Sequence, residues 1–456
     1  MAARLWTAGL LMVWMLAPAS ATAQSTQAEV LADEEVAEVV RQTFSPDADV
    51  RNYFLKALEM RGLPDVVPGL IQVMRFTRDD GEIDQTIASL TGEEPGKGWP
   101  EWMLWQQAHP EIEPFEGFDT FKADTMAVID PNFRLFLQPG VAHDIRLEEI
   151  VWGGVLKDGI PALVNPKHLS PDEATYLQDD ELVFGVEING DARAYPLRVL
   201  DWHEMFNDVV GGVPVALAYC TLCGSGILYD MRVSDRDEPF EFGSSGFLYR
   251  SNKLMYDQQT HSLWNQFTGK PVVGPLTGSG IELDTLPVTI TTWRDWREQQ
   301  PQTKVLSLDT GHERDYTPGR PYGEYFASAE LMFPVLVEDT RLAPKDYVFA
   351  LRGATPKAWS LADFEGGRVI QDDDLGVVLV GDAASRTVRA YETGGRDFEA
   401  GADLSMLRAD GQDWLVEEAG LTGPAGEQLK RLPGHIAYWF AWQNFIDGAR
   451  LAEQQG

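Results

Sequence analysis

The sequence predicts an α+β protein that is mostly β, in which a short N-terminal helical region precedes two related β-rich lobes. Three observations support this prediction. Near the N-terminus, apolar residues recur at three- and four-residue steps, as on one face of a helix. Beyond about residue 150, short runs of Val, Ile, Tyr and Phe alternate with Gly, Pro, Asp and Asn turns, which is typical of strands. That strand pattern then recurs later in the chain, which indicates an internal repeat.

Residues 1–23 have the pattern of a secretory signal peptide. Arg4 precedes the apolar run Leu10–Ala17, and the small-residue triplet Ala21-Thr22-Ala23 follows. The apolar run is too short to span a bilayer comfortably. We therefore expect an exported protein, periplasmic or secreted, with no membrane association after the signal is cleaved.

The chain is strongly acidic, with a formal net charge of -34 over 456 residues. A charge of this sign repels phosphate backbones and anionic lipid surfaces. Nucleic acid and membrane-surface partners are therefore not expected.

The helical region is predicted to cover residues 34–145. Apolar residues at helical spacing occur on both sides of Gly62-Leu63-Pro64, so this part should form two short helices, similar to one HEAT-type repeat. The Trp-rich segment Gly98–His109 is expected to be another helix. A single helical pair cannot bury its own apolar face, so it must dock on another part of the chain.

The two β-rich lobes are predicted at residues 150–325 and 326–450, the second ending in a C-terminal helix. In the first lobe, Leu182–Ile188 and Ala192–Leu197 flank Asn189-Gly190, and Asn-Gly is the preferred pair for a two-residue hairpin turn. The segments Val213–Tyr219 and Gly226–Val233 are further predicted strands.

Two stretches of the first lobe have counterparts in the second. Leu182–Leu197 matches Tyr347–Leu361, and Val215–Asp230 matches Val377–Glu392. Their common order and nearly constant offset favour an internal duplication over chance matching of apolar strands.

The only two cysteines of the chain, Cys220 and Cys223, stand in the first lobe with two residues between them. Two thiolates at this spacing can chelate a soft metal or close a small, reducible disulfide. A structural staple is disfavoured, because so short a loop removes little entropy from the unfolded chain. The alternative without a function is that both cysteines are buried and pack as small apolar residues. The second lobe has Asp382 and Ser385 at the matching positions.

Residues 181–310 resemble the domain-of-unknown-function family DUF3179, which consists of exported bacterial proteins. The blocks that carry the resemblance are Trp202–Gly226, Phe242–Gly269, Thr291–Ser307 and His435–Phe445. The resemblance covers most of residues 150–450 and implies no activity, because none is established for the family. It implies that the motif positions are His203, Glu204, Cys220, Cys223, Gly224, Tyr256 and Asp257. His261 stands where the family is expected to have a small residue.

The first functional hypothesis is a metal site in an accessory protein rather than a turnover enzyme. Cys220, Cys223 and His203 are the predicted ligands, because a hairpin through Gly211-Gly212 would bring His203 opposite Cys220. Two thiolates with an imidazole suit copper as Cu(I), with zinc as the alternative. Further ligands or pocket residues could come from Met255, Tyr256, Asp257 and Glu204.

The alternative hypothesis is a periplasmic thiol–disulfide oxidoreductase that uses the same two cysteines. The segment after Cys223 indicates a turn into a strand, which argues against a thioredoxin fold but not against redox chemistry. Either function implies a metal-delivery or redox partner protein of unknown identity. A cysteine hydrolase using Cys223 with His203 or His261 and Asp257 is a third, weaker hypothesis. Charged residues such as Arg250, Lys253 and Asp372–Asp374 are interpreted as solvated loop charges.

Overall fold

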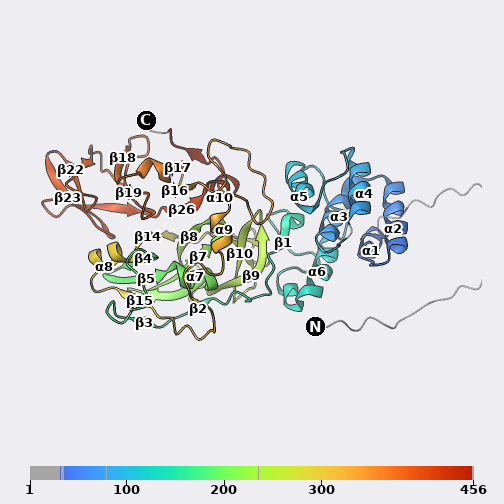
Figure 1. Cartoon of the computed structure of the whole chain (residues 1–456), viewed down its shortest axis with the longest axis horizontal. Coiled ribbons are helices and arrows are strands. Elements are labelled where there is room, and N and C mark those ends of the chain that lie inside the picture. The colour runs from blue at the N-terminus through green and yellow to red at the C-terminus, as the bar shows by residue number, and fades with distance from the viewer. Residues whose placement is uncertain (1–30, 32–34, 79, 235, 454–456) are drawn as a thin grey trace, which may run out of the picture.

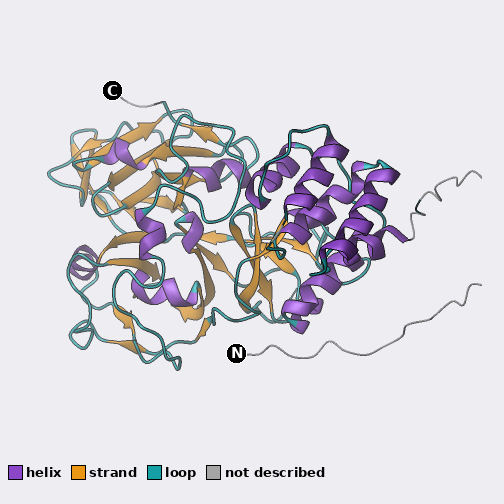
Figure 2. Cartoon of the chain, turned by 45° about the vertical axis from the view of Figure 1, so that its right-hand side comes forward, coloured by secondary structure: helices purple, strands orange, loops and turns teal. Residues whose placement is uncertain are grey.

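The computed structural model describes residues 31, 35–78, 80–234 and 236–453. The predicted signal peptide, residues 1–23, lies outside the described residues. Helices gather at one end of the molecule and strands fill the other, as Figures 1 and 2 show. The protein is thus α+β and mostly β, with its first six helices at the N-terminal end, which confirms the predicted class.

The N-terminal helices are α1 (Val36–Gln42), α2 (Ala48–Arg61), α3 (Val67–Met74), α4 (Gly81–Thr91), α5 (Trp99–Ala108) and α6 (Phe118–Ile129). Helix α2 begins after Asp47, whose carboxylate accepts hydrogen bonds from the backbone N–H groups of Asp49 and Val50. It ends at Gly62, which adopts the left-handed conformation with φ of 70°. The predicted interruption at Gly62-Leu63-Pro64 and the predicted Trp-rich helix are both confirmed.

The helical region docks on the first lobe through strands β1 (Ile150–Trp152) and β9 (Phe242–Tyr249). The rings of Phe133 and Phe247 lie 4.3 Å apart between their centroids. The buried Lys122 of α6 donates a hydrogen bond of 2.6 Å to the carbonyl of Ile150. One buried apolar cluster continues from these helices to Cys220 and Cys223. The apolar faces of the helices are therefore buried against the lobe, as the helical repeat requires.

Residues 150–325, the predicted first lobe, contain three sheets of five strands, in the orders β1-β9-β10-β11-β12, β13-β8-β7-β6-β2 and β14-β4-β5-β15-β3. Besides β1 and β9, its strands are β2 (Leu163–Val164), β3 (His168–Leu169), β4 (Leu182–Ile188), β5 (Asp191–Pro196), β6 (Met205–Val210), β7 (Val213–Cys220), β8 (Ser225–Asp230), β10 (Asn252–Asp257), β11 (Leu263–Asn265), β12 (Lys270–Val273), β13 (Thr285–Leu286), β14 (Thr289–Thr292) and β15 (Lys304–Leu306). Its helices are α7 (Leu197–His203) and α8 (Trp293–Gln299), and α9 (Gly323–Ala327) follows. The predicted hairpin is β4–β5, whose turn residues Asn189 and Gly190 both have positive φ.

The second lobe contains one sheet of four strands, β26-β16-β17-β27, and one of eight, β18-β19-β20-β25-β24-β23-β22-β21. The strands are β16 (Tyr347–Leu351), β17 (Lys357–Ser360), β18 (Arg368–Asp372), β19 (Val377–Asp382), β20 (Thr387–Glu392), β21 (Glu399–Ala400), β22 (Met406–Ala409), β23 (Gln412–Val416), β24 (Gly420–Thr422), β25 (Gln428–Leu432), β26 (His435–Tyr438) and β27 (Arg450–Leu451). The helix α10 (Trp439–Phe445) lies between β26 and β27, where the C-terminal helix was predicted.

The two lobes share one apolar core. A single buried cluster contains Phe184 and Leu217 of the first lobe together with Phe349 and Leu379 of the second. A charged group also joins them, because Glu418 pairs with Arg389 and Arg431 and accepts a hydrogen bond of 2.9 Å from Thr289 on β14. The lobes are thus parts of one packed body, which Figure 1 shows with the second lobe above the first. Within the described part of the chain, no helix has both the length and the apolar character needed to cross a bilayer.

Candidate functional site

The Cys220–Cys223 segment is a tight turn at the end of a β-hairpin. Strand β7 ends at Cys220, a single 3-10 turn covers Thr221–Cys223, and β8 starts at Ser225. Gly224 closes the turn with φ of 57°, and a Cβ atom there would lie 2.8 Å from the ring of Tyr347. Glycine is therefore needed both for the left-handed backbone and for the space. The predicted turn into a strand is confirmed, and the cysteines do not begin a helix of thioredoxin type.

The two sulfur atoms face each other in the interior. The distance between Cys220 Sγ and Cys223 Sγ is 2.9 Å, and both thiols are free and buried. Cys223 Sγ also accepts a hydrogen bond of 3.1 Å from Asn252 Nδ2 and lies 3.5 Å from the carbonyl oxygen of Ser251. Burial raises the pKa of the Cys223 thiol well above its usual value, and the neighbouring Cys220 raises it further, while the Asn252 hydrogen bond opposes both effects.

The wall behind Cys223 comes from the segment Phe242–Gly269, which contains the predicted pocket residues Met255, Tyr256 and Asp257, but Asn252 and Gln266 form it instead. Asn252 Nδ2 donates a second hydrogen bond, of 2.8 Å, to Gln266 Oε1. Gln266 Nε2 in turn donates to the carbonyl of Ala218 on β7 at 2.8 Å. This chain of amides connects β10 to the cysteine hairpin and holds the Asn252 donor against Cys223.

Glu204 lies on the other side of the cysteine turn. It follows the last residue of α7 and has a left-handed backbone, with φ of 53°. Its carboxylate accepts hydrogen bonds of 2.9 Å from Thr221 Oγ1 and 3.0 Å from Tyr322 OH. A non-glycine residue in this conformation is strained, and such strain is common at functional sites. The sequence predicted Glu204 as a pocket residue, and the structure places it in contact with the cysteine turn.

Lys253 is buried and paired, so its interpretation as a solvated loop charge is wrong. Its side chain is only 5% exposed, and its Nζ lies 3.3 Å from Glu204 Oε2 and 3.1 Å from the Glu204 carbonyl oxygen. Arg250 likewise pairs with the buried Glu149 at 2.5 Å. A buried charge needs a partner of opposite sign. Lys253 lies in Phe242–Gly269, one of the segments that carry the family resemblance, but no feature of the sequence indicated its pairing with Glu204.

His203 is engaged elsewhere. The ladder between β6 and β7 pairs Met205 with Ala218, so the predicted hairpin through Gly211-Gly212 is confirmed. His203, however, belongs to α7 and not to β6. Its Nδ1 lies 2.8 Å from the carbonyl oxygen of Pro161, and its Nε2 lies 2.6 Å from Tyr316 OH. Burial lowers the pKa of His203 to about 4, so the ring is neutral at pH 7.

The remaining predicted site residues make contacts of their own. Tyr256 OH donates to the Asp158 carboxylate at 2.8 Å, and Asp257 accepts from Trp264 Nε1 at 2.8 Å. Met255 is buried in β10, between Ser244 on β9 and Trp264 on β11. His261 lies beside the ring of Tyr256, 6.2 Å between centroids. Among the described residues, the hydrogen-bond partners of Cys223 include none of the side chains that the hydrolase hypothesis requires.

The predicted metal ligands are not assembled in this arrangement. Within residues 31, 35–78, 80–234 and 236–453, no three side chains of His, Cys, Asp and Glu are placed to share a metal ion. The two thiols are adjacent, but both nitrogens of the His203 ring have partners other than sulfur. Copper or zinc binding therefore remains a prediction that depends on the cysteines themselves.

A cavity of about 50 Å³ lies in front of Cys220. Its polar lining includes Cys220, Thr221, Glu204, Lys253 and Tyr322. Phe333 and the half-exposed Met332 stand on the other side. Cys223 does not line it. The two thiols are thus inequivalent, since only Cys220 borders this space.

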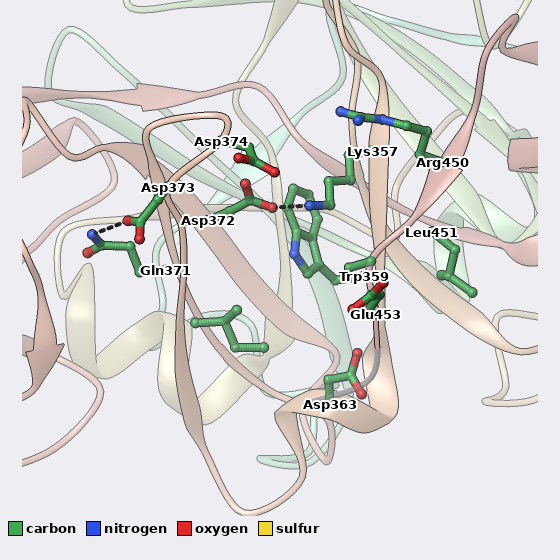
Figure 3. Close-up of a pocket in the computed structure, with 12 residues that line it drawn as sticks. Lys357, Trp359, Asp363, Gln371, Asp372, Asp373, Asp374, Arg450, Leu451 and Glu453 are labelled. Atoms are coloured by element: carbon green, nitrogen blue, oxygen red, sulfur yellow. Dashed lines mark hydrogen bonds and ion pairs between the residues drawn. The ribbon is translucent and has the colours of Figure 1, made fainter. Parts of the chain in front are cut away.

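A wider cavity of about 470 Å³ lies in the second lobe, remote in sequence from the cysteines (Figure 3). It is lined by both acidic and basic side chains, and Lys357 forms an ion pair with Asp372 across it. Asp372 is buried, which corrects its interpretation as a solvated loop charge. At the positions that match the cysteines, Ser385 Oγ donates to Thr387 Oγ1 at 2.8 Å, and Asp382 accepts from the Ala384 N–H.

Fold and site together define a mostly β protein with a buried cysteine pair on a hairpin, surrounded by amide, carboxylate and ammonium groups. The model of the family DUF3179, described as a protein of unknown function, matches residues 157–449, and the chain belongs to this family. The resemblance inferred from the sequence is thereby confirmed. A search of curated proteins and a search of solved structures each gave no match.

Proposed function

We propose that Cys220 and Cys223 form a reversible dithiol–disulfide couple in an exported protein. The observation that carries this proposal is the contact between the two sulfur atoms, which lie 2.9 Å apart. A disulfide bond is about 2.05 Å long, so oxidation requires the sulfurs to approach by less than about 1 Å.

The surroundings of Cys223 support the same proposal. In the reduced pair the Cys220 S–H can donate to Cys223, and the Asn252 amide adds a second donor at 3.1 Å. The Asn252 donor favours the thiolate of Cys223, which is the form that attacks another sulfur, and it opposes the burial that raises the pKa of this thiol. The Gln266 amide fixes the orientation of Asn252 and so keeps this donor in place.

Holding Cu(I), with Zn(II) as the alternative metal, is the second candidate. The adjacency of two soft sulfur ligands in a buried turn favours it. Bonds of about 2.3 Å to one tetrahedral ion would place the sulfurs about 3.7 Å apart, so the pair would have to open. A third ligand from His203 would also have to leave Pro161 and Tyr316. Because metal binding requires both of these changes, we favour the redox function over the metal function.

Export to the periplasm or the outside of the cell is part of the proposal and rests on the signal-like residues 1–23. Such a compartment permits disulfides to persist. A reductant must then return the oxidised pair to the dithiol, and we propose a redox partner protein or small thiol for this role. The net charge of -34 disfavours nucleic acid as a partner.

We also infer that the two lobes arose by duplication. Each has a central hairpin, β4–β5 or β16–β17, flanked by one antiparallel and one parallel strand. In both, a short helix joins the flanking strands, α8 in the first and α10 in the second. A three-stranded meander follows each hairpin, β6-β7-β8 and β18-β19-β20. The β19–β20 turn then corresponds to the cysteine turn.

Metal analysis of anaerobically purified protein separates the two candidate functions. The redox proposal predicts no stoichiometric metal and two titratable thiols, which become one disulfide on mild oxidation. The matched control is the Cys220→Ser/Cys223→Ser double variant, which should lose the couple and keep its secondary structure by circular dichroism. About one copper per wild-type chain, absent from the double variant, would instead establish the metal function.

A further inference from the structure

The two cysteines differ in access, and this difference bears on what can oxidise them. Cys220 lines the cavity of about 50 Å³ and Cys223 does not. Cys223 is instead enclosed by Asn252, Ser251 and Cys220 itself. A reagent that enters the cavity therefore meets Cys220 first.

The size of the cavity restricts the class of oxidant. This volume counts only the positions open to the centre of a water molecule, and one water needs about 10–15 Å³ of it, so the space accepts a small molecule the size of a few waters. Thiol–disulfide exchange with a protein requires the attacking sulfur to reach a disulfide in line, and Cys220 is only 1% exposed. A protein disulfide or a quinone reaches a thiol so enclosed only when the site opens, as it must also open for glutathione or a reducing partner protein, whereas a small molecule can enter the closed site.

The polar lining suits an oxidant that carries oxygen atoms. Lys253 borders the cavity, and its ammonium carries three N–H donors, of which Glu204 takes two. Thr221 and Tyr322 also border the cavity, and each gives its single hydroxyl hydrogen to Glu204, so their oxygens can only accept hydrogen bonds there. An ammonium beside a small space stabilises the oxyanion that leaves when an O–O bond breaks.

We propose that the oxidant is a small hydroperoxide, of which hydrogen peroxide is the simplest, and that Cys220 is the thiol it oxidises. This inference rests on the proposed dithiol couple. The Cys220 sulfur attacks one peroxide oxygen, the O–O bond breaks, and the other oxygen leaves as water or an alcohol after taking the thiol proton. Cys220 is then a sulfenic acid. The Cys223 sulfur attacks it, the S–S bond forms, and the sulfenic oxygen leaves as water with the Cys223 proton. Two thiols are oxidised and one peroxide is reduced.

The order of attack is tested with full-length, metal-free, reduced protein and limiting hydrogen peroxide without oxygen, followed by acid quenching and peptide mass analysis. In the wild type the product is the Cys220–Cys223 disulfide. In Cys223→Ser, Cys220 should gain one oxygen atom. In Cys220→Ser, Cys223 should remain a thiol over the same time. Oxidation of Cys223 in Cys220→Ser at the rate of Cys220 in Cys223→Ser would overturn the assignment.

The size restriction is tested by comparing hydrogen peroxide with a bulky organic hydroperoxide such as tert-butyl hydroperoxide. We expect the wild type to react at least about tenfold faster with hydrogen peroxide, relative to free cysteine under the same conditions. Met332→Ala, which widens the mouth of the cavity, should reduce this preference several-fold. Met60→Ala, an exposed methionine on α2, is the matched control and should leave it unchanged.

These experiments distinguish a failure of the peroxide inference from a failure of the proposed dithiol–disulfide couple. Equal preference for both peroxides, or oxidation no faster than that of free cysteine, overturns the peroxide inference alone if glutathione buffers still show a reversible couple. Absence of that couple overturns the proposed function and the inference together.

Discussion

At Gly224 the cysteine turn depends on a residue without a side chain. We predict that Gly224→Ala destabilises the protein, because the left-handed backbone disfavours a Cβ and because that Cβ would lie 2.8 Å from the Tyr347 ring. The conformational part should cost about 1–2 kcal/mol, and the displaced ring adds to it. Urea unfolding followed by circular dichroism measures the loss.

Gly212 provides the control, since its φ is 81° and a Cβ there would have open space around it. Gly212→Ala should carry the conformational cost alone and therefore cost less than Gly224→Ala. Equal losses in the two variants would show that Tyr347 does not constrain the turn.

Glu204 and Lys253 form a buried pair, so removing one partner leaves the other charge unpaired. We predict that Glu204→Gln or Lys253→Met alone lowers the free energy of unfolding by about 3 kcal/mol. The double variant should lose less than the sum of the two, and a double-mutant cycle in urea measures the difference. Strictly additive losses would mean that the two groups do not interact.

At the scale of elements, the docking of α6 on β1 depends on the buried Lys122. Burial lowers its pKa from 10.5 to about 7. Between about pH 7 and pH 10.5 the unfolded chain therefore binds a proton that the folded chain lacks, so the free energy of unfolding rises with pH across this window. We predict that the free energy of unfolding rises less with pH in Lys122→Met than in the wild type. Urea unfolding near pH 7 and near pH 10.5 measures the difference.

Lys56, an exposed residue of α2, supplies the matched control. Lys56→Met should leave the pH dependence as it is in the wild type. An unchanged pH dependence in Lys122→Met would mean that the ammonium is solvated and that α6 docks without burying it.

Elements with local signals could be predicted from the sequence, and contacts between distant segments could not. Asn189-Gly190 specifies its own two-residue turn, and Gly211-Gly212 specifies the hairpin that ends at the cysteines. The sequence predicts His203 opposite Cys220, but α7 extends to His203, so that its neighbour Glu204 contacts the cysteine turn instead. Tyr322 is about a hundred residues from Cys220, and no motif marks it as a neighbour.

For the whole molecule, the shared core predicts that the two lobes unfold together. Leu379 of the second lobe is fully buried in the cluster that also contains first-lobe residues. We predict that Leu379→Ala lowers the free energy of unfolding by about 2–5 kcal/mol. Because both cysteines lie in the first lobe, their labelling by a thiol reagent in urea reports whether that lobe opens with the second.

The midpoint of thiol labelling should shift in Leu379→Ala by the same amount as the midpoint of circular dichroism. The exposed Leu415 on β23 is the control position, and Leu415→Ala should move neither midpoint appreciably. A labelling midpoint that stays at the wild-type value would show that the lobes are energetically independent.

The cysteine couple itself is tested most directly by equilibrating the purified, metal-free chain with glutathione buffers of graded potential and trapping the thiols with acid. We predict a reversible two-electron transition between two thiols and one Cys220–Cys223 disulfide. Its midpoint should lie above about -300 mV, the region below which structural disulfides fall. Thiols that stay reduced at every potential, or a disulfide that resists reduction below about -300 mV, would contradict a redox role for the pair.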